Sequence, residues 1–313
     1  MNKIYLLVFF VVINLLTQTS FAQDDLMKML DDSAPQKNEK VFATFKDFKI
    51  INAHTTETVK KKTLSFCISH RFSNVNTGIH GFYGFDSADN IRFSFDYGIT
   101  DKLMVGIGRS KVHELLDGSI KYRLLDQTTN NHVPVSLAFY GCGALTPMKN
   151  DGTLDKFAHR LSYSSQLIVA RKFGSKLSLE LLPTYVHRNY VGGLINDYNF
   201  AQETNDLFAL GIGGRVKITK RSAIIFDCFY TFSQYRVKNA VDPYYLPLSI
   251  GYEIETGGHV FHINFTNSSG LVENEYIPYT NDNWLKGGFK LGFNISRVFN
   301  IGRHHKDDDH DGD

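Results

Sequence analysis

The fold is decided by the stretch IRFSFDYGIT at residues 91–100 and by KLMVGIGRS, which follows at 102–110. In the first stretch, apolar residues such as Phe93 and Phe95 alternate with polar residues such as Arg92. Successive side chains of a β-strand point to opposite faces, so this alternation predicts a strand with one apolar and one polar face. The short link between the stretches predicts that the two strands pair as an antiparallel hairpin.

The same period of two recurs along the rest of the chain from residue 63 onward. Most of these stretches are about ten residues long, the length that a tilted strand needs to cross a lipid bilayer. Strands of soluble sandwiches are usually shorter, about five or six residues. We expect about twelve strands, with ten to fourteen as the range, near residues 63–72, 91–100, 102–110, 120–124, 135–140, 161–172, 177–185, 208–218, 224–233, 248–255, 261–266 and 289–296.

The links between these strands alternate in length. The links after the even-numbered strands are short, and most of the others are long, with the link at 113–118 as the exception. Short turns at one edge and long loops at the other are typical of outer-membrane barrels. The sequence therefore predicts an all-β fold, a single closed antiparallel transmembrane β-barrel with long extracellular loops and short periplasmic turns. Closure requires the last strand to pair with the first, because lipid satisfies no free backbone groups.

The alternative is a soluble β-sandwich or lipid-binding barrel, in which the apolar side chains point inward. Composition allows either architecture, since the 313-residue chain is 42% hydrophobic and 13% aromatic with a net charge of +2. On the membrane interpretation, the mean hydropathy of −0.21 averages a lipid-facing surface and a charged lumen. The aromatic residues expected to face lipid are Phe66, Phe93, Phe95, Tyr97, Phe139, Phe226, Tyr230, Phe261, Phe265, Phe289 and Phe293.

The N-terminal 22 residues have the pattern of an export signal. Lys3 precedes an apolar stretch at 4–16, and the small residues Ser20 and Ala22 suit a signal peptidase that cleaves after Ala22. Export predicts an outer-membrane location for the barrel. Three cysteines in separate strands argue against a disulfide framework.

Residues 23–62 differ from the barrel sequence at 63–302, and we expect them to form a periplasmic segment. This segment comprises a short helix at 24–32, a linker, and an alternating stretch at 41–53 that suits either an extra strand or a plug. The tail at 303–313 is expected to be charged and disordered. Its histidines offer at most a weak metal site without fixed geometry, at His304, His305 and His310.

The polar face of the strands is expected to line the lumen. Eight cations against five anions make this face mildly cationic, which suits a passive pore or transporter for small, anionic solutes. The alternative is a closed structural or partner-binding barrel, in which the same charges form ion pairs and loops or the N-terminal segment fill the lumen. The charged residues concerned are Arg71, Arg92, Asp96, Lys121, Arg123, Lys172, Glu180, Arg215, Lys217, Asp227, Glu253, Glu255 and Lys290.

An outer-membrane hydrolase is a third hypothesis, and the sequence favours it least. His70 and Ser73 come nearest to a serine–histidine pair, but their spacing places them on opposite faces of a strand. We expect no enzymatic activity, no cofactor and no nucleic-acid partner. The expected partners are outer-membrane lipid and either a small solute or a periplasmic protein.

Several runs resemble an uncharacterised family of Bacteroidetes outer-membrane β-barrels, known as a domain of unknown function. The resemblance covers about residues 41–302 and implies an outer-membrane barrel without an assigned activity or functional residues. The matching runs are HRF at 70–72, YGITDKLMVGIGRS at 97–110, DGSIKYRLLDQ at 117–127, AHRLSYSSQLIVARKF at 158–173, LPTYVHRN at 182–189, ETGGHVFHINFTNS at 255–268 and GFNISRVFNI at 292–301.

Overall fold

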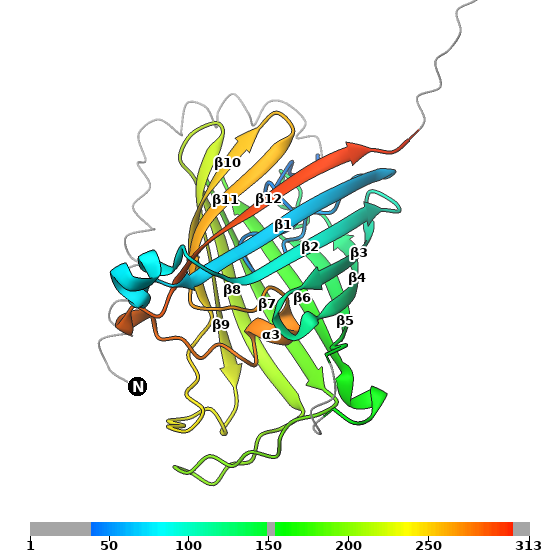
Figure 1. The fold of residues 1–313 in the computed structure, drawn as a ribbon. Coiled ribbons are helices and arrows are strands. Elements are labelled where there is room, and N and C mark those ends of the chain that lie inside the picture. The colour runs from blue at the N-terminus through cyan, green and yellow to red at the C-terminus, as the bar shows by residue number, and fades with distance from the viewer. Residues whose placement is uncertain (1–38, 149–153, 303–313) are drawn as a thin grey trace, which may run out of the picture. The chain divides into compact units, whose positions relative to one another are not determined.

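The computed structural model describes residues 39–148 and 154–302. Twelve antiparallel strands form a closed barrel in which β12 pairs with β1, which confirms the predicted fold (Figure 1). The predicted signal peptide, the helix at 24–32 and the tail at 303–313 lie outside the described residues. The strands are β1 Thr63–Asn74, β2 Ala88–Gly98, β3 Leu103–Ser110, β4 Leu116–Leu125, β5 Ser136–Leu145, β6 Leu161–Phe173, β7 Leu177–Arg188, β8 Asp206–Lys217, β9 Ser222–Phe232, β10 Leu248–Thr256, β11 His259–Thr266 and β12 Lys290–Asn300.

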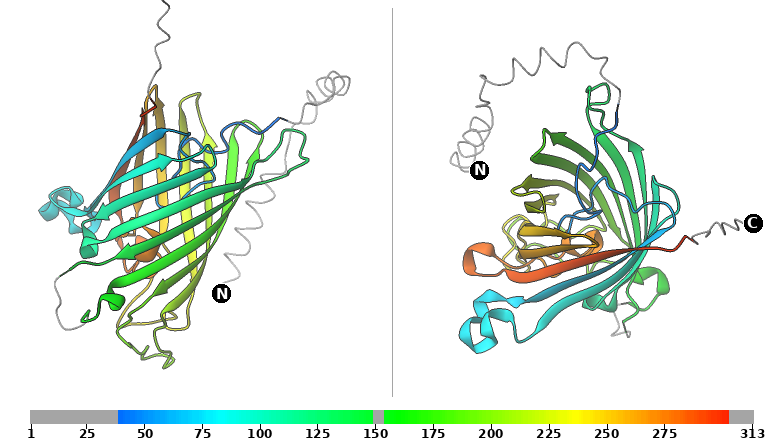
Figure 2. Two further views of the ribbon diagram at one scale, coloured as in Figure 1. Left: turned by 90° about the vertical axis from the view of Figure 1, so that its right-hand side faces the viewer. Right: turned by 90° about the horizontal axis from the view of Figure 1, so that it is seen from above.

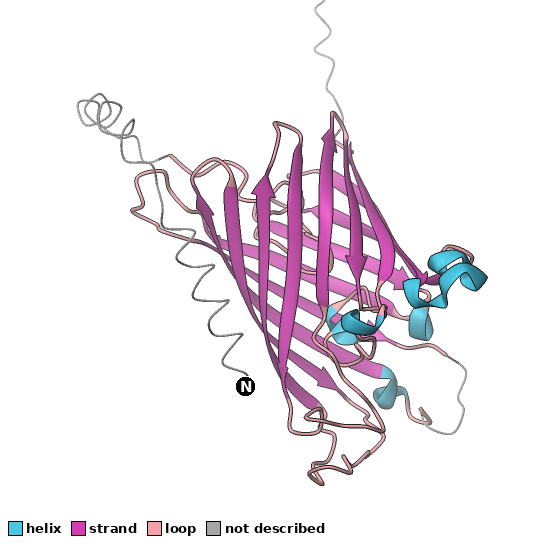
Figure 3. Cartoon of the chain, turned by 90° about the vertical axis from the view of Figure 1, so that its left-hand side faces the viewer, coloured by secondary structure: helices cyan, strands magenta, loops and turns pink. Residues whose placement is uncertain are grey.

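The two ends of the barrel differ in their connections (Figure 3). One end, the short-turn end, carries the turns after the even-numbered strands, together with the start of β1 and the end of β12. The other, the long-loop end, carries the remaining loops and the short helices. Its shortest loop, between β3 and β4, is shorter than the turn between β4 and β5 at the opposite end. The helices are η1 Val75–Gly84, η2 Val112–Glu114, η3 Phe157–Arg160, α3 Glu273–Tyr276 and η4 Trp284–Lys286.

The apolar face of the strands points outward. On β2, Phe93 and Phe95 are 44% and 45% exposed, whereas Arg92 and Asp96 on either side of them are 6% and 4% exposed. A soluble barrel or sandwich would show the reverse, so the burial pattern contradicts that alternative. All eleven aromatic residues expected to face lipid are at least partly exposed. No helix within the described residues is long and apolar enough to span a membrane.

One local expectation is wrong, and one of two alternatives is decided in favour of the plug. The fourth strand begins at Leu116 rather than near residue 120, because Asp117 and Gly118 belong to the β3–β4 and β4–β5 ladders. No strand forms over residues 41–53, where the chain bends repeatedly and makes one isolated bridge between Lys49 and His54. The backbone there is hydrogen-bonded to side chains of the barrel wall instead of to a neighbouring strand.

Residues 40–62, which we call the N-terminal plug, enter the barrel, with their middle part inside the lumen and both ends at its rim (Figure 2). The plug begins at the short-turn end, where Lys40 bridges to Thr128 in the turn between β4 and β5. It ends at the same end, where Lys61 bridges to Gly98 at the end of β2. The plug therefore enters and leaves the lumen through one mouth.

Candidate functional site in the barrel lumen

The middle of the N-terminal plug is fully enclosed. Every residue from 48 to 56 is buried, including the polar residues Asn52, His54 and Thr55. Burial of so much polar surface is tolerated only where the groups find hydrogen-bond partners. Those partners come from the polar faces of the strands.

Asn52 makes the most contacts with the wall. Its side-chain amide donates to Ser249 on β10 at 3.0 Å, and its side-chain oxygen accepts from the Arg71 guanidinium of β1 at 3.0 Å. Its backbone N–H donates to Asp227 on β9 at 2.7 Å. The N–H of Ala53 donates to the same carboxylate oxygen at 3.2 Å. One short stretch of backbone is thus bound to strands that are far apart in the sequence.

Lys121 on β4 binds the plug through backbone carbonyls. Its ammonium donates to the carbonyl oxygens of Phe48 at 2.8 Å, Thr55 at 2.9 Å and Glu57 at 3.2 Å. These three acceptors use all three ammonium protons. The plug backbone is therefore folded around a lysine of the wall.

Further hydrogen bonds fix the plug on other sides of the lumen. Side chains of β6, β7 and β12 take part in them, and each joins a wall residue to a plug residue. The contacts are Lys172 with the Phe42 carbonyl at 2.8 Å, Ser178 with the Thr44 carbonyl at 2.5 Å, Asn294 with the Ile51 carbonyl at 2.9 Å and Ser296 with the Asp47 carboxylate at 2.5 Å.

Apolar packing completes the plug. Phe45, Ile50 and Ile51 form a cluster with Ala170 and Ile225 of the wall. A second cluster joins Phe48 and Val59 to Cys67 and Met104. His54 stacks on Tyr140 with ring centroids 3.8 Å apart.

Residues 267–289, which we call the fold-back loop, lie at the long-loop end (orange to red-brown around α3 in Figure 1), and their buried first part, 267–278, fills that end of the lumen. Its residues Leu271, Val272, Tyr276 and Ile277 are each at most 2% exposed. The Tyr276 ring packs against Phe229 of β9 with centroids 5.1 Å apart. The fold-back loop meets the N-terminal plug where the Lys49 ammonium donates to the Leu271 carbonyl at 3.2 Å.

The charged residues predicted to line the lumen divide into two groups. Residues of the first group form ion pairs, and several of their partners are not among the charged residues predicted to line the lumen. Arg92 pairs with Asp117 at 2.5 Å, Arg123 with Asp126 at 3.2 Å, Arg215 with Glu253 at 2.7 Å, Glu255 with Lys46 at 2.5 Å, and Lys290 with Asp282.

The second group forms no ion pair with the described residues and contains Arg71, Asp96, Lys121, Lys172, Glu180, Lys217 and Asp227. Arg71, Lys121, Lys172 and Asp227 are instead bound to the plug. Glu180 is buried, and neither of its carboxylate oxygens has a hydrogen-bond partner among the described residues.

Sequence reasoning missed the acids that balance these cations. Asp117 lies in phase with Lys121 on β4, but the run Asp117-Gly118-Ser119 has the composition of a turn. Asp282 comes from the fold-back loop, whose position in space no local pattern reveals. The predicted cationic excess of the lumen is therefore offset by residues outside the expected strands.

The polar residues considered for catalysis do not form a serine–histidine pair. His70 stacks on Phe293 at 5.2 Å, and the Ser73 hydroxyl is hydrogen-bonded to Ser87. His187 is hydrogen-bonded at 2.7 Å to Asp206 on the outer face. No group of three or more His, Cys, Asp or Glu side chains suited to a metal ion occurs in the described part of the chain. The histidines at 304, 305 and 310 lie outside that part.

Comparison with known proteins gives one family and several solved barrels. The family model "membrane bound beta barrel domain (DUF5777)" matches residues 45–299. No curated protein sequence matches the chain. The structure resembles the NanC porin, with 7% identity over 75% of this chain and 98% of that one and a TM-score of 0.46.

Two further solved structures resemble the barrel at similarly low identity. The outer membrane protein Omp33 of Acinetobacter baumannii has 7% identity, covers 76% of this chain and 99% of its own, and gives a TM-score of 0.41. LpxR from Salmonella typhimurium has 10% identity, covers 76% and 99%, and gives a TM-score of 0.34.

Proposed function

The chain belongs to the DUF5777 family of membrane-bound β-barrel domains, and on that premise we propose that it is an outer-membrane barrel held closed by its own N-terminal plug. In this proposal the long loops face the outside of the cell, and the plug enters the lumen from the periplasm. The observation that carries the proposal is the set of hydrogen bonds from plug residues 42–57 to side chains of seven strands, β1, β4, β6, β7, β9, β10 and β12.

A barrel closed in this way acts as a membrane-embedded scaffold for a partner and does not conduct solutes. Each hydrogen bond to a charged group is worth about 1.5–3 kcal/mol, and those of neutral groups about 1 kcal/mol. Arg71, Lys121 and Asp227 all make charged bonds to the plug in a buried setting. The closed state is therefore the stable one, and the surfaces left for a partner are the short-turn end and the long loops.

A gated pore for small solutes is the second candidate, and the polarity of the lumen wall favours it. Glu180 and Asn264 are buried, and both side chains have polar atoms without a partner among the described residues. A wall of this kind is suited to water once the plug is withdrawn. Some charged residues of the lumen form no ion pair within the wall or with the fold-back loop. Four of them are cations and four are anions, so we expect little charge selectivity. They are Arg71, Lys121, Lys172 and Lys217, and Asp96, Glu180, Asp227 and Glu255.

Conductance in planar bilayers tests the proposal. The full chain should give no steady conductance, and neither should a variant with only residues 42–57 scrambled, because the fold-back loop still fills the other end of the lumen. A double variant that also replaces residues 271–277 by a Gly-Ser linker of equal length should give stable channels. The scrambled variant keeps the length and composition of the plug but loses its matched contacts, and heat-modifiable gel migration shows whether the barrel has folded. Steady channels from the full chain would contradict a closed barrel. Folded but silent double-variant protein would contradict both the plug-closed barrel and the gated pore, because the lumen would then be closed without either segment.

A further inference from the structure

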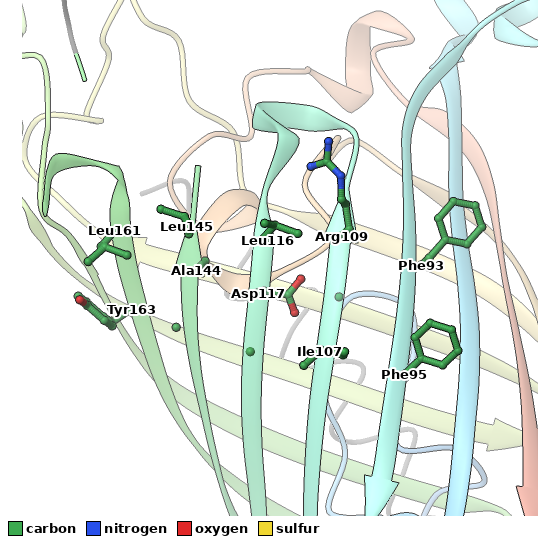
Figure 4. A pocket seen from close by; sticks show the side chains of 13 residues that line it. Phe93, Phe95, Ile107, Arg109, Leu116, Asp117, Ala144, Leu145, Leu161 and Tyr163 are labelled. Carbon is green, nitrogen blue, oxygen red and sulfur yellow. The ribbon is translucent and has the colours of Figure 1, made fainter. Parts of the chain in front are cut away.

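The outer surface of the barrel carries a groove that the closed lumen does not explain (Figure 4). It has a volume of about 560 Å³ and crosses β2 to β6. Its floor is made by Gly118 on β4 and Gly143 on β5, which face each other in the ladder. A Cβ on Gly118 would meet no atom within 4 Å, and one on Gly143 would meet only the Tyr163 ring, at 3.8 Å. The groove therefore exists because two adjacent outward positions lack side chains.

Large apolar side chains stand on both sides of the glycine floor. The strand register places Ile107 beside Gly118 and Tyr163 beside Gly143. Tyr163 stacks on His187 at 6.4 Å, and His187 is hydrogen-bonded to Asp206 at 2.7 Å. This wall of the groove is thus supported by a neighbouring polar contact.

A cation marks the long-loop end of the groove. Arg109 pairs in the ladders with Phe93 and Leu116 and is exposed at the edge of the apolar band (Figure 4). Its guanidinium donates to the Glu114 carbonyl and forms no ion pair with the described residues. Because a guanidinium has five N–H donors, most remain available for an anion.

We propose that this groove binds one acyl chain of a lipid whose phosphate headgroup contacts Arg109. A groove of this volume lies within the range of ligand-binding sites. Bulk lipid tails are as apolar as the groove, so the chain is retained by close packing against the glycine floor and its walls. Preference among lipids must come from the headgroup, through charge-assisted hydrogen bonds between guanidinium and phosphate at the membrane surface.

Native mass spectrometry of the full chain in detergent tests the proposal with two phospholipids that have identical acyl chains. Phosphatidylglycerol should bind as a single adduct at least fivefold more tightly than zwitterionic phosphatidylcholine. Gly143→Leu should fill the groove and weaken phosphatidylglycerol binding at least fivefold. Gly141→Leu is the matched control, since Gly141 faces outward on the same strand but does not line the groove.

Two further variants keep the test decisive. If Gly143→Leu does not fold, Gly118→Leu fills the same floor from β4, where the space is open. Arg109→Gln should abolish the preference for phosphatidylglycerol, whereas Arg171→Gln should keep it, because Arg171 stacks on Phe173 near the short-turn end. Equal binding by the Gly143→Leu and Gly141→Leu variants would overturn the proposal. So would a dimer of the wild-type chain that the Gly143→Leu substitution dissociates, since a second copy would then occupy the groove.

Discussion

The N-terminal plug and the fold-back loop fill the same lumen from opposite ends, but different interactions hold them. The backbone of the plug depends on the wall, since Lys121, Asp227 and Asn294 bond directly to its peptide groups. The fold-back loop satisfies part of its own backbone in α3, where the Tyr276 N–H donates to the Val272 carbonyl at 3.0 Å. It packs on the wall through apolar side chains such as Tyr276 and is also hydrogen-bonded to it, for example from the Asn90 amide on β2 to the Ser269 carbonyl at 2.8 Å.

This difference indicates which closure is more easily opened. Internal hydrogen bonds of α3 and non-directional apolar burial together support the fold-back loop, so the loss of a single polar group on the wall weakens it less. A plug that depends on wall side chains for its backbone partners is weakened by each substitution that removes a donor or acceptor. We therefore expect the fold-back loop to stay in place while the plug exchanges between bound and open states.

The largest effect is expected from Tyr276→Ala in the fold-back loop. Tyr276 is 0% exposed and packs on Phe229, so its loss leaves a cavity of the kind that costs about 3–5 kcal/mol for large aromatic residues. Hydrogen exchange of amides 275–277 should lose its protection in the variant, while the plug amides at 50–55 keep theirs. Leu285→Ala is the control, because Leu285 is 95% exposed. If the plug amides lost their protection as well, the plug and the fold-back loop would not open independently of each other.

A smaller effect, confined to the plug instead of the fold-back loop, is expected from Lys121→Met. The substitution keeps the length of the side chain but removes the charged donor from the carbonyls of Phe48, Thr55 and Glu57. The loss should favour plug opening by about 2 kcal/mol, which is about 30-fold faster exchange of the amides at 48–57.

The control for Lys121→Met is Lys217→Met. Lys217 is half-buried on the polar face of β8, and its ammonium makes no hydrogen bond to the described residues of the plug. If the two variants accelerate exchange equally, charge removal in general rather than the three carbonyl contacts would be the cause. Unchanged exchange of amides 275–277 in both variants would show that the fold-back loop does not follow the plug.

The predictability of the two regions from sequence differs for the same physical reason. The barrel follows from period-two alternation within each strand, a local pattern that stays visible in residues such as Phe93 and Arg92. The plug depends on side chains of seven strands that meet only after closure, so nothing in the sequence around Asn52 reveals its partners. The strand position of Gly118 is not predictable for a different reason. The run Asp117-Gly118-Ser119 has the composition of a turn, although in the structure it forms part of β4.

The smallest effect is expected from pH at the mouth of the fold-back loop. His113, in the loop between β3 and β4, contacts the Glu275 carboxylate at 3.3 Å, and this hydrogen bond raises the pKa of His113. Burial raises the pKa of Glu275, against the effect of His113, so desolvation of the carboxyl group outweighs the pairing on that side. The imidazole is 46% exposed, and solvent screening leaves the contact worth a few tenths of a kcal/mol.

A raised histidine pKa stabilises the folded contact at pH values below the unfolded pKa, about 6.5, and that contribution disappears as pH rises through the higher folded value. Amides 275–277 should therefore open slightly more readily at pH 8.5 than at pH 5.5, once the intrinsic pH dependence of exchange is removed. His113→Asn should abolish the difference, whereas His159→Asn should keep it, since His159 stacks on Tyr190 instead. A pH difference of the same sign that persists in the His113→Asn variant would assign it to Glu275 instead, because a carboxyl group whose pKa is raised by burial also stabilises the folded loop at low pH and loses that contribution as pH rises.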